Sequence, residues 1–130
     1  MVNMDDKTKN ALFLKVKDPV QCHLFKNTPG KSDLALTNFV CLKTLEHESH
    51  LIRYILQCKQ CGQLYFFEFY EVIDWVAGND PQYNTYIPVS TVEEAEKLNT
   101  RSSFDICYVT PRLQDDWGAE DTEKTIKWVR

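Results

Sequence analysis

The stretch LIRYILQCKQCGQLYFFEFYEVIDW spans residues 51–75 and decides the fold. It places an apolar segment on each side of a Cys-x-x-Cys-Gly turn that begins at Cys58 and ends at Gly62. Two thiolates at this spacing can grip one metal ion, and glycine permits the left-handed conformation that closes such a turn. The pattern therefore predicts half of a zinc site at the tip of a β-hairpin.

The segment after the turn also fits a helix, because Glu68, Glu71 and Asp74 recur every third residue. Its composition favours a strand. Six of the eleven residues in 65–75 are aromatic, and aromatic and β-branched side chains suit a pleated surface. Both faces of such a strand would be largely covered, so we expect it in the middle of a sheet.

Length and composition predict one domain of 130 residues, since 43% hydrophobic and 26% charged residues exclude general disorder. We expect a flexible tail at residues 1–10 and a single domain at 11–130. The first residues, MVNMDDKTKN, lack the apolar stretch of a signal peptide, which predicts a soluble cytoplasmic protein. Five cysteines fit a reducing compartment with metal or free thiols better than a disulfide framework.

The charge is divided unevenly along the chain. Residues 1–60 hold nine Lys or Arg against six Asp or Glu, whereas residues 61–130 hold six against thirteen. A phosphate backbone is gripped by clustered Lys and Arg, so this distribution argues against nucleic acid as the main partner. An acidic second half suits a basic protein partner, although a solvated acidic face with no partner is an equally good interpretation.

The rest of the chain predicts further strands and one clear helix. The strands are expected at residues 11–17, 20–26, 34–45, 85–89 and 104–110. Ser90 and Glu93 form a capping box that opens a helix at residues 91–99. We therefore predict an α+β fold, a single domain with a mostly antiparallel sheet, one or two helices and a zinc-knuckle-like hairpin.

A structural zinc ion needs four ligands, and Cys58 with Cys61 supplies two. The remaining candidates are Cys22, His23, Cys41, His47, His50 and Cys107. An extended chain between His50 and Cys58 would keep the two later histidines roughly 23 Å away, at about 3.3 Å per residue. We predict Cys22, Cys41, Cys58 and Cys61 as the metal ligands, with His23 as the alternative. Cys41 and Cys107 also fit buried apolar positions, and His23 also fits an ordinary strand histidine.

Catalytic motifs are missing from the sequence. It has no Gly-x-Ser-x-Gly and no His-Glu-x-x-His. Gly30-Lys31-Ser32 resembles the end of a phosphate-binding loop, but Phe25 occupies the position of the leading glycine. We expect a protein that is not an enzyme.

Residues 58–89 carry a Cys-x-x-Cys-Gly-Gln turn, an aromatic strand, Asp74-Trp75, an Asp-Pro-x-Tyr at Asp80–Tyr83 and a Tyr-x-Pro close at Tyr86–Pro88. This run resembles a group of small bacterial proteins that have no assigned catalytic residues. In size and charge the chain is also similar to the immunity proteins encoded beside polymorphic or contact-dependent growth inhibition toxins. The second resemblance implies a binding protein that neutralises a toxin domain.

The first hypothesis is therefore an immunity-type protein with a structural zinc site, which covers the active site of a basic toxin domain of the nuclease class. Its expected partner-binding residues are Asp115, Asp116, Glu120 and Asp121, with Trp117 as the aromatic anchor. The alternative is a zinc-ribbon-like nucleic-acid accessory protein that uses the basic first half.

Overall fold

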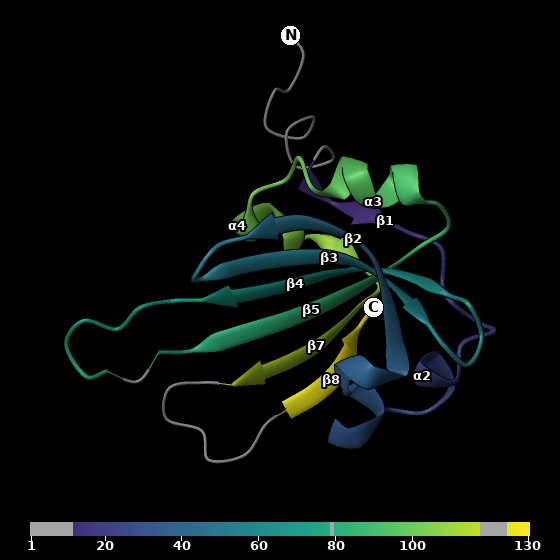
Figure 1. Ribbon diagram of the computed structural model, residues 1–130, viewed down its shortest axis with the longest axis horizontal. Coiled ribbons are helices and arrows are strands. Elements are labelled where there is room, and N and C mark those ends of the chain that lie inside the picture. The colour runs from purple at the N-terminus through teal and green to yellow at the C-terminus, as the bar shows by residue number, and fades with distance from the viewer. Residues whose placement is uncertain (1–11, 79, 118–124) are drawn as a thin grey trace, which may run out of the picture.

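The protein has an α+β fold, as the sequence predicted, in a computed structural model that describes residues 12–78, 80–117 and 125–130. Six strands form an antiparallel sheet in the order β2-β3-β4-β5-β7-β8, and β1 and β6 form a small parallel sheet (Figure 1). The expected tail at residues 1–10 lies outside the described residues.

The elements have the following bounds. The strands of the large sheet are β2 (Phe39–His47), β3 (Leu51–Cys58), β4 (Leu64–Glu71), β5 (Gln82–Val89), β7 (Arg112–Trp117) and β8 (Thr125–Val129). The small sheet pairs β1 (Leu14–Lys15) with β6 (Val109–Thr110). The helices are α2 (His23–Lys26), α3 (Val92–Leu98) and α4 (Ser103–Ile106), with 3-10 turns η1 (Lys31–Leu34) and η2 (Leu36–Asn38).

The aromatic strand β4 lies inside the sheet, between β3 and β5, which confirms the expectation of a covered central strand. Its side chains alternate between two apolar layers. Tyr65 and Phe67 point to one face, whereas Phe66 and Glu68 point to the other, and all four are buried. The two faces are therefore packed by different parts of the chain.

The layer on the Tyr65 side, called here the α2 face, is formed by residues 18–38, which run across the sheet as α2, η1 and η2 (Figure 1). Its core holds Cys22, Leu24, Leu34, Phe39, Leu56, Cys58, Tyr65, Phe67, Tyr86 and Leu113. Its backbone hydrogen bonds lie mostly within the segment itself, so its position on the sheet depends on the side chains that it buries.

The layer on the Phe66 side, called here the α3 face, is covered by α3, α4 and the small parallel sheet (Figure 1). Its core holds Val16, Ile55, Phe66, Ile87, Val89, Ala95, Leu98, Ile106 and Val109. The chain from α3 to β6 lies between β5 and β7 in sequence, although these two strands are neighbours in the sheet.

Two predicted strands are partly helical. Residues 20–26 contain α2, and residues 104–110 begin in α4 and form a strand only at β6. The hydroxyl of Ser102 accepts a hydrogen bond from the N–H of Asp105 at 3.1 Å and so caps α4. A one-turn helix satisfies part of its own backbone, whereas a strand needs a neighbour with free hydrogen-bonding groups.

Three predicted boundaries also shift. The strand expected at residues 34–45 starts only at Phe39, after η1 and η2, and the aromatic strand ends at Glu71. Helix α3 is capped by Thr91, whose side chain accepts from the N–H of Glu94 at 3.1 Å, rather than by Ser90.

None of the described helices has the length and apolar character needed to span a bilayer.

Candidate metal centre

The Cys-x-x-Cys-Gly sequence forms the tight turn between β3 and β4, as predicted. Cys58 is the last residue of β3, and its carbonyl accepts a hydrogen bond from the N–H of Gly62 at 2.8 Å. The N–H of Cys58 donates to the carbonyl of Gln63 at 2.8 Å, which continues the hairpin. Gly62 has φ +81°, a left-handed conformation in which a side chain would be strained.

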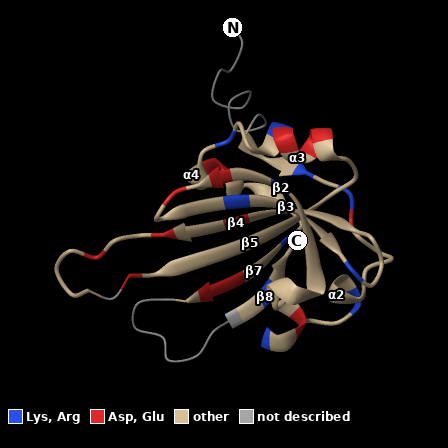
Figure 2. Cartoon of the chain, viewed as in Figure 1, with Lys and Arg blue, Asp and Glu red and all other residues tan. Residues whose placement is uncertain are grey.

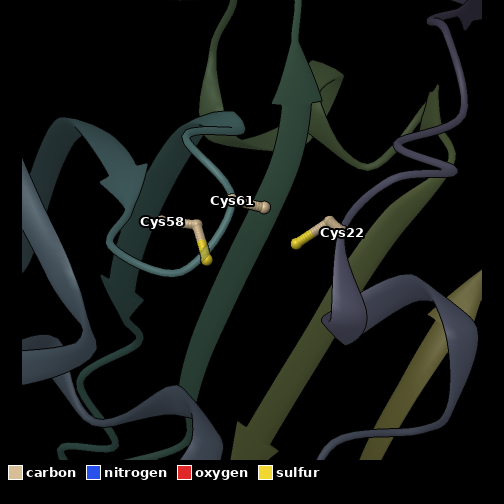
Figure 3. Close-up of side chains that lie close together, drawn as sticks. All are labelled: Cys22, Cys58 and Cys61. Atoms are coloured by element: carbon tan, nitrogen blue, oxygen red, sulfur yellow. The ribbon is translucent and has the colours of Figure 1, made fainter.

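The third cysteine, Cys22, lies in the segment 18–38 that covers the α2 face of the sheet. Cys22 is the N-cap of α2, and its N–H donates to the carbonyl of Pro19 at 2.9 Å. Its side chain is fully buried and points toward the turn (Figure 3). The prediction that Cys22 lies beside the two turn cysteines is therefore confirmed.

The sulfur atoms of Cys22, Cys58 and Cys61 all lie within 4.8 Å of one another, close enough to hold a metal ion. Tetrahedral zinc with Zn–S bonds of about 2.3 Å holds its sulfurs about 3.8 Å apart, so a small contraction of this cluster would meet that geometry. Two of the three residues are buried and Cys61 is half-buried. Such a site is shielded yet reachable through Cys61.

Tyr65 lies beneath the cluster and donates a hydrogen bond from its hydroxyl to Sγ of Cys22 at 3.0 Å. Burial raises the pKa of the Cys22 thiol to about 12, and burial also raises the pKa of Tyr65 well above its usual range. The Cys22 sulfur would carry a thiolate charge at neutral pH only beside a cation. A bound metal would supply that cation, and the Tyr65 hydroxyl would then donate to the metal-bound thiolate.

Tyr65→Phe is expected to weaken zinc binding by about tenfold. The substitution removes the hydroxyl that donates to Sγ of Cys22 and leaves the packing of the ring in place. The measurement is a competition titration with a chromophoric chelator at fixed pH. Tyr54→Phe serves as the control, since Tyr54 packs on the same face outside the cysteine cluster. Equal affinities for the two variants would contradict a role of the Tyr65 hydroxyl.

The prediction of Cys41 as a metal ligand is wrong, because Cys41 lies outside the cysteine cluster. It lies on β2 opposite Leu56, its side chain is exposed, and its Sγ contacts the carbonyl of Lys43 at 3.7 Å. Two irregularities in the pairing of β2 with β3 occur at Cys41/Lys43 and Thr44/Glu46, which the sequence does not reveal. Cys107 is also exposed, so neither cysteine is the buried apolar residue that its neighbours suggested.

The three histidines are divided between the two ends of the sheet. His47 ends β2 and His50 follows the turn, where Nδ1 of His50 lies 3.0 Å from Oε1 of Glu71. Both are therefore remote from the cysteines, as expected. His23 directly follows Cys22, and its Nδ1 atom is buried without a hydrogen-bond partner.

The predicted partner-binding residues are separated by the alternation of β7. Asp115 is only 4% exposed and its Oδ2 accepts from Nζ of Lys31 at 3.3 Å, so it belongs to the α2 face and corrects the prediction. Asp116 points to the α3 face, where burial raises its pKa, and Trp117 is 43% exposed. Glu120 and Asp121 lie outside the described residues.

Sequence reasoning missed the most exposed apolar residues. Trp75 and Val76 are 91% and 99% exposed in the loop between β4 and β5. The available signal was Asp74, three residues after the end of β4 at Glu71, because aspartate before a glycine-containing segment is typical of a turn.

Comparison with protein-family profiles, curated proteins and solved structures found no match for this chain.

Proposed function

We propose that the protein is a non-catalytic binding protein of the immunity type, which neutralises a basic toxin domain of the nuclease class by covering its active site. The supporting observation is the acidic charge and the exposed tryptophan at the end of the sheet opposite the cysteine turn. This end, called here the open end, comprises residues 46–50, 71–78, 80 and 116–117. Its charge and its exposed aromatic residue are those of a surface that binds a basic protein.

The open end is acidic throughout. Its carboxylates are Glu46, Glu48, Glu71, Asp74, Asp80 and Asp116, and the ranges that define it contain no Lys or Arg. Figure 2 has Asp and Glu at the end of β4, in the loop before β5 and on β7. A field of one sign would steer a basic domain to this end and would weaken with added salt.

Hydrogen bonds to the backbone on both sides of Trp75 tie the loop after β4. Oδ1 of Asp74 accepts from the N–H groups of Val76 at 3.1 Å and Ala77 at 3.0 Å. The N–H of Asp74 in turn donates to Oδ1 of Asp80 at 2.7 Å. An exposed aromatic residue on a hydrogen-bonded loop loses little entropy on binding, as hot-spot residues do. Trp75 therefore takes the role of aromatic anchor that the sequence analysis gave to Trp117.

The cysteine cluster would serve this function as a fastening, with zinc as the ion. Thiolates from Cys58 and Cys61 at the turn and from Cys22 before α2 would join residues 18–38 to the sheet. Zinc is the ion best suited to a buried cysteine set because it has no redox chemistry and favours tetrahedral sulfur ligation. It would supply structure and no reaction step.

The nucleic-acid alternative has less support. Four of the nine Lys and Arg side chains in residues 1–60 form ion pairs with carboxylates, at Lys15–Asp18, Lys31–Asp115, Lys43–Glu96 and Arg53–Glu68. Lys and Arg that are already paired release fewer counterions from a phosphate backbone, so they contribute less to affinity.

The test uses the toxin domain encoded by the adjacent gene as the binding partner. Trp75→Ala is expected to weaken its binding by about 30-fold, which corresponds to the loss of about 2 kcal/mol at a hot-spot aromatic residue. Because the side chain is 91% exposed, the unfolding temperature should not change. Isothermal titration calorimetry at two salt concentrations measures both the affinity and its electrostatic part.

The matched control is Leu36→Ala, which removes an apolar side chain that is 53% exposed on η2, at the cysteine end of the sheet, where Phe39 pairs with Cys58. We expect it to bind with wild-type affinity. Binding that is equally strong in both variants would reject the open end as the docking surface. A protein that does not bind the adjacent-gene product would reject the immunity function.

A further inference from the structure

The cysteine cluster is one ligand short of a closed zinc site, because it offers three sulfur atoms and structural zinc is four-coordinate. Cys41 and Cys107 are exposed and lie outside the cluster. His47 and His50 lie at the open end. Of the cysteines and histidines in the described part of the chain, this leaves His23 as the candidate for the fourth position.

His23 carries an unexplained polar atom. Within the described residues, its Nδ1 and Oδ1 of Asp115 are the only buried side-chain nitrogen or oxygen atoms without a hydrogen-bond partner. Buried polar atoms almost always have a partner, and an isolated one often marks the place of an ion or a water molecule. The Nδ1 atom therefore needs a partner that the described residues do not provide.

The position of His23 brings that atom beside the cluster. His23 is the first residue of α2 and directly follows the N-cap Cys22. Together with Cys58, it lines a cavity of about 220 Å³ whose other lining residues are Asp33, Asn38, Lys59 and Gln60. The cavity thus joins the histidine ring to the turn that carries two of the three sulfurs.

We infer, on the basis of the proposed zinc site, that Nδ1 of His23 completes a Cys₃His centre with Cys22, Cys58 and Cys61. The atom lies outside the group of sulfurs that are within 4.8 Å of one another, so the ring turns about its side-chain torsions when the metal binds. Ligation through Nδ1 leaves the Nε2–H group free to donate. Asp33 lies in the same cavity and offers a carboxylate of the kind that orients metal-bound histidines.

The test uses cobalt(II) alone as the probe, added to the reduced full-length protein under argon. Cobalt(II) reports its ligands through sulfur-to-cobalt charge-transfer bands and through visible d–d bands that respond to the fourth ligand. His23→Ala is expected to bind cobalt at least about tenfold more weakly and to shift the d–d bands, while the charge-transfer bands keep their three-thiolate intensity. His50→Ala, at the open end, should match the wild type in both respects.

A His23→Ala variant with wild-type affinity and wild-type d–d bands would overturn the inference while leaving the three-cysteine site intact. A wild-type protein that gives no charge-transfer band would overturn the proposed zinc site together with it. X-ray absorption of the wild-type zinc protein provides an answer that does not depend on how the variant folds. The expected first shell has three sulfur atoms and one imidazole nitrogen, and a shell without the imidazole scattering pattern would exclude His23.

Discussion

Cys58→Ser is expected to lower the unfolding temperature by about 10–20 °C in zinc-containing buffer, and chelation of the wild type should have the same effect. A ligand that binds only the folded state stabilises it by about 4 kcal/mol at a free concentration one thousand times its Kd. For a chain of this size, each kcal/mol moves the midpoint by roughly 2–8 °C. Loss of one thiolate would remove most of that contribution, because the two remaining sulfurs bind zinc far more weakly.

The effect should be confined to the segment that zinc would fasten. Hydrogen exchange of the chelated protein is expected to rise in residues 18–38, which Cys22 joins to the β3–β4 turn through the cluster. Exchange in β4 should change little, since its two faces stay packed. Differential scanning fluorimetry with and without a chelator gives the midpoints.

The chain provides matched controls for this experiment. Cys41→Ser and Cys107→Ser change exposed cysteines that lie outside the cluster, and both should melt with the wild type whether or not the chelator is present. If Cys58→Ser melts with these controls, the cluster does not stabilise the fold through a metal.

Arg53→Met is expected to cost about 3–5 kcal/mol of folding free energy. Nη2 and Nε of Arg53 donate to Oε2 of Glu68 at 2.7 Å and 2.8 Å, and both side chains are buried on the α3 face. Nη1 also donates to the carbonyl of Asn99, just after α3. Methionine keeps much of the volume, so the cost arises from a buried carboxylate left without its cation.

A double variant separates this cost from packing. Arg53→Met combined with Glu68→Leu removes both charges and is expected to recover most of the lost free energy, because a well-packed apolar pair can replace a buried ion pair. Urea unfolding with an unchanged m-value measures each difference. A double variant no more stable than Arg53→Met would show that packing, rather than the unpaired charge, dominates.

The exposed pair Lys43–Glu96 is the control for this ion pair. Its two charged groups are 2.7 Å apart, which is as close as in the buried pair, but about half of each side chain is exposed. Solvent screens such a pair, so Glu96→Gln should cost less than about 1 kcal/mol.

The sequence predicted the parts of the fold that depend on local patterns. The aromatic run of 65–75 identified a strand covered on both sides, and Gly62 identified the turn that joins it to β3. Residues 20–26 and 104–110 were assigned wrongly because short apolar segments fit a strand and a helical turn equally well. Ser102 with Asp105 was an available sign of α4 that the interpretation did not use.

The site was predicted as far as spacing and reach allow. Cys22 was found because a long connection lets it approach the turn, and Cys41 was wrong because the pairing irregularities in β2 could not be foreseen. Asp115 and Asp116 differ in environment because neighbours on a strand point to opposite faces. Their charge was visible in the sequence, but the face that each would occupy was not.

Strands β3, β4 and β5 each span eight residues, so the cysteine turn and the loop that carries Trp75 stand roughly 26 Å apart at about 3.3 Å per residue. Mutations at one extremity therefore leave the other undisturbed. If the toxin partner diversifies rapidly, the Trp75 loop could therefore change in sequence while the cysteine cluster stays the same. Grafting the Trp75 loop from one homologue onto another should then transfer the choice of partner without destabilising the fold.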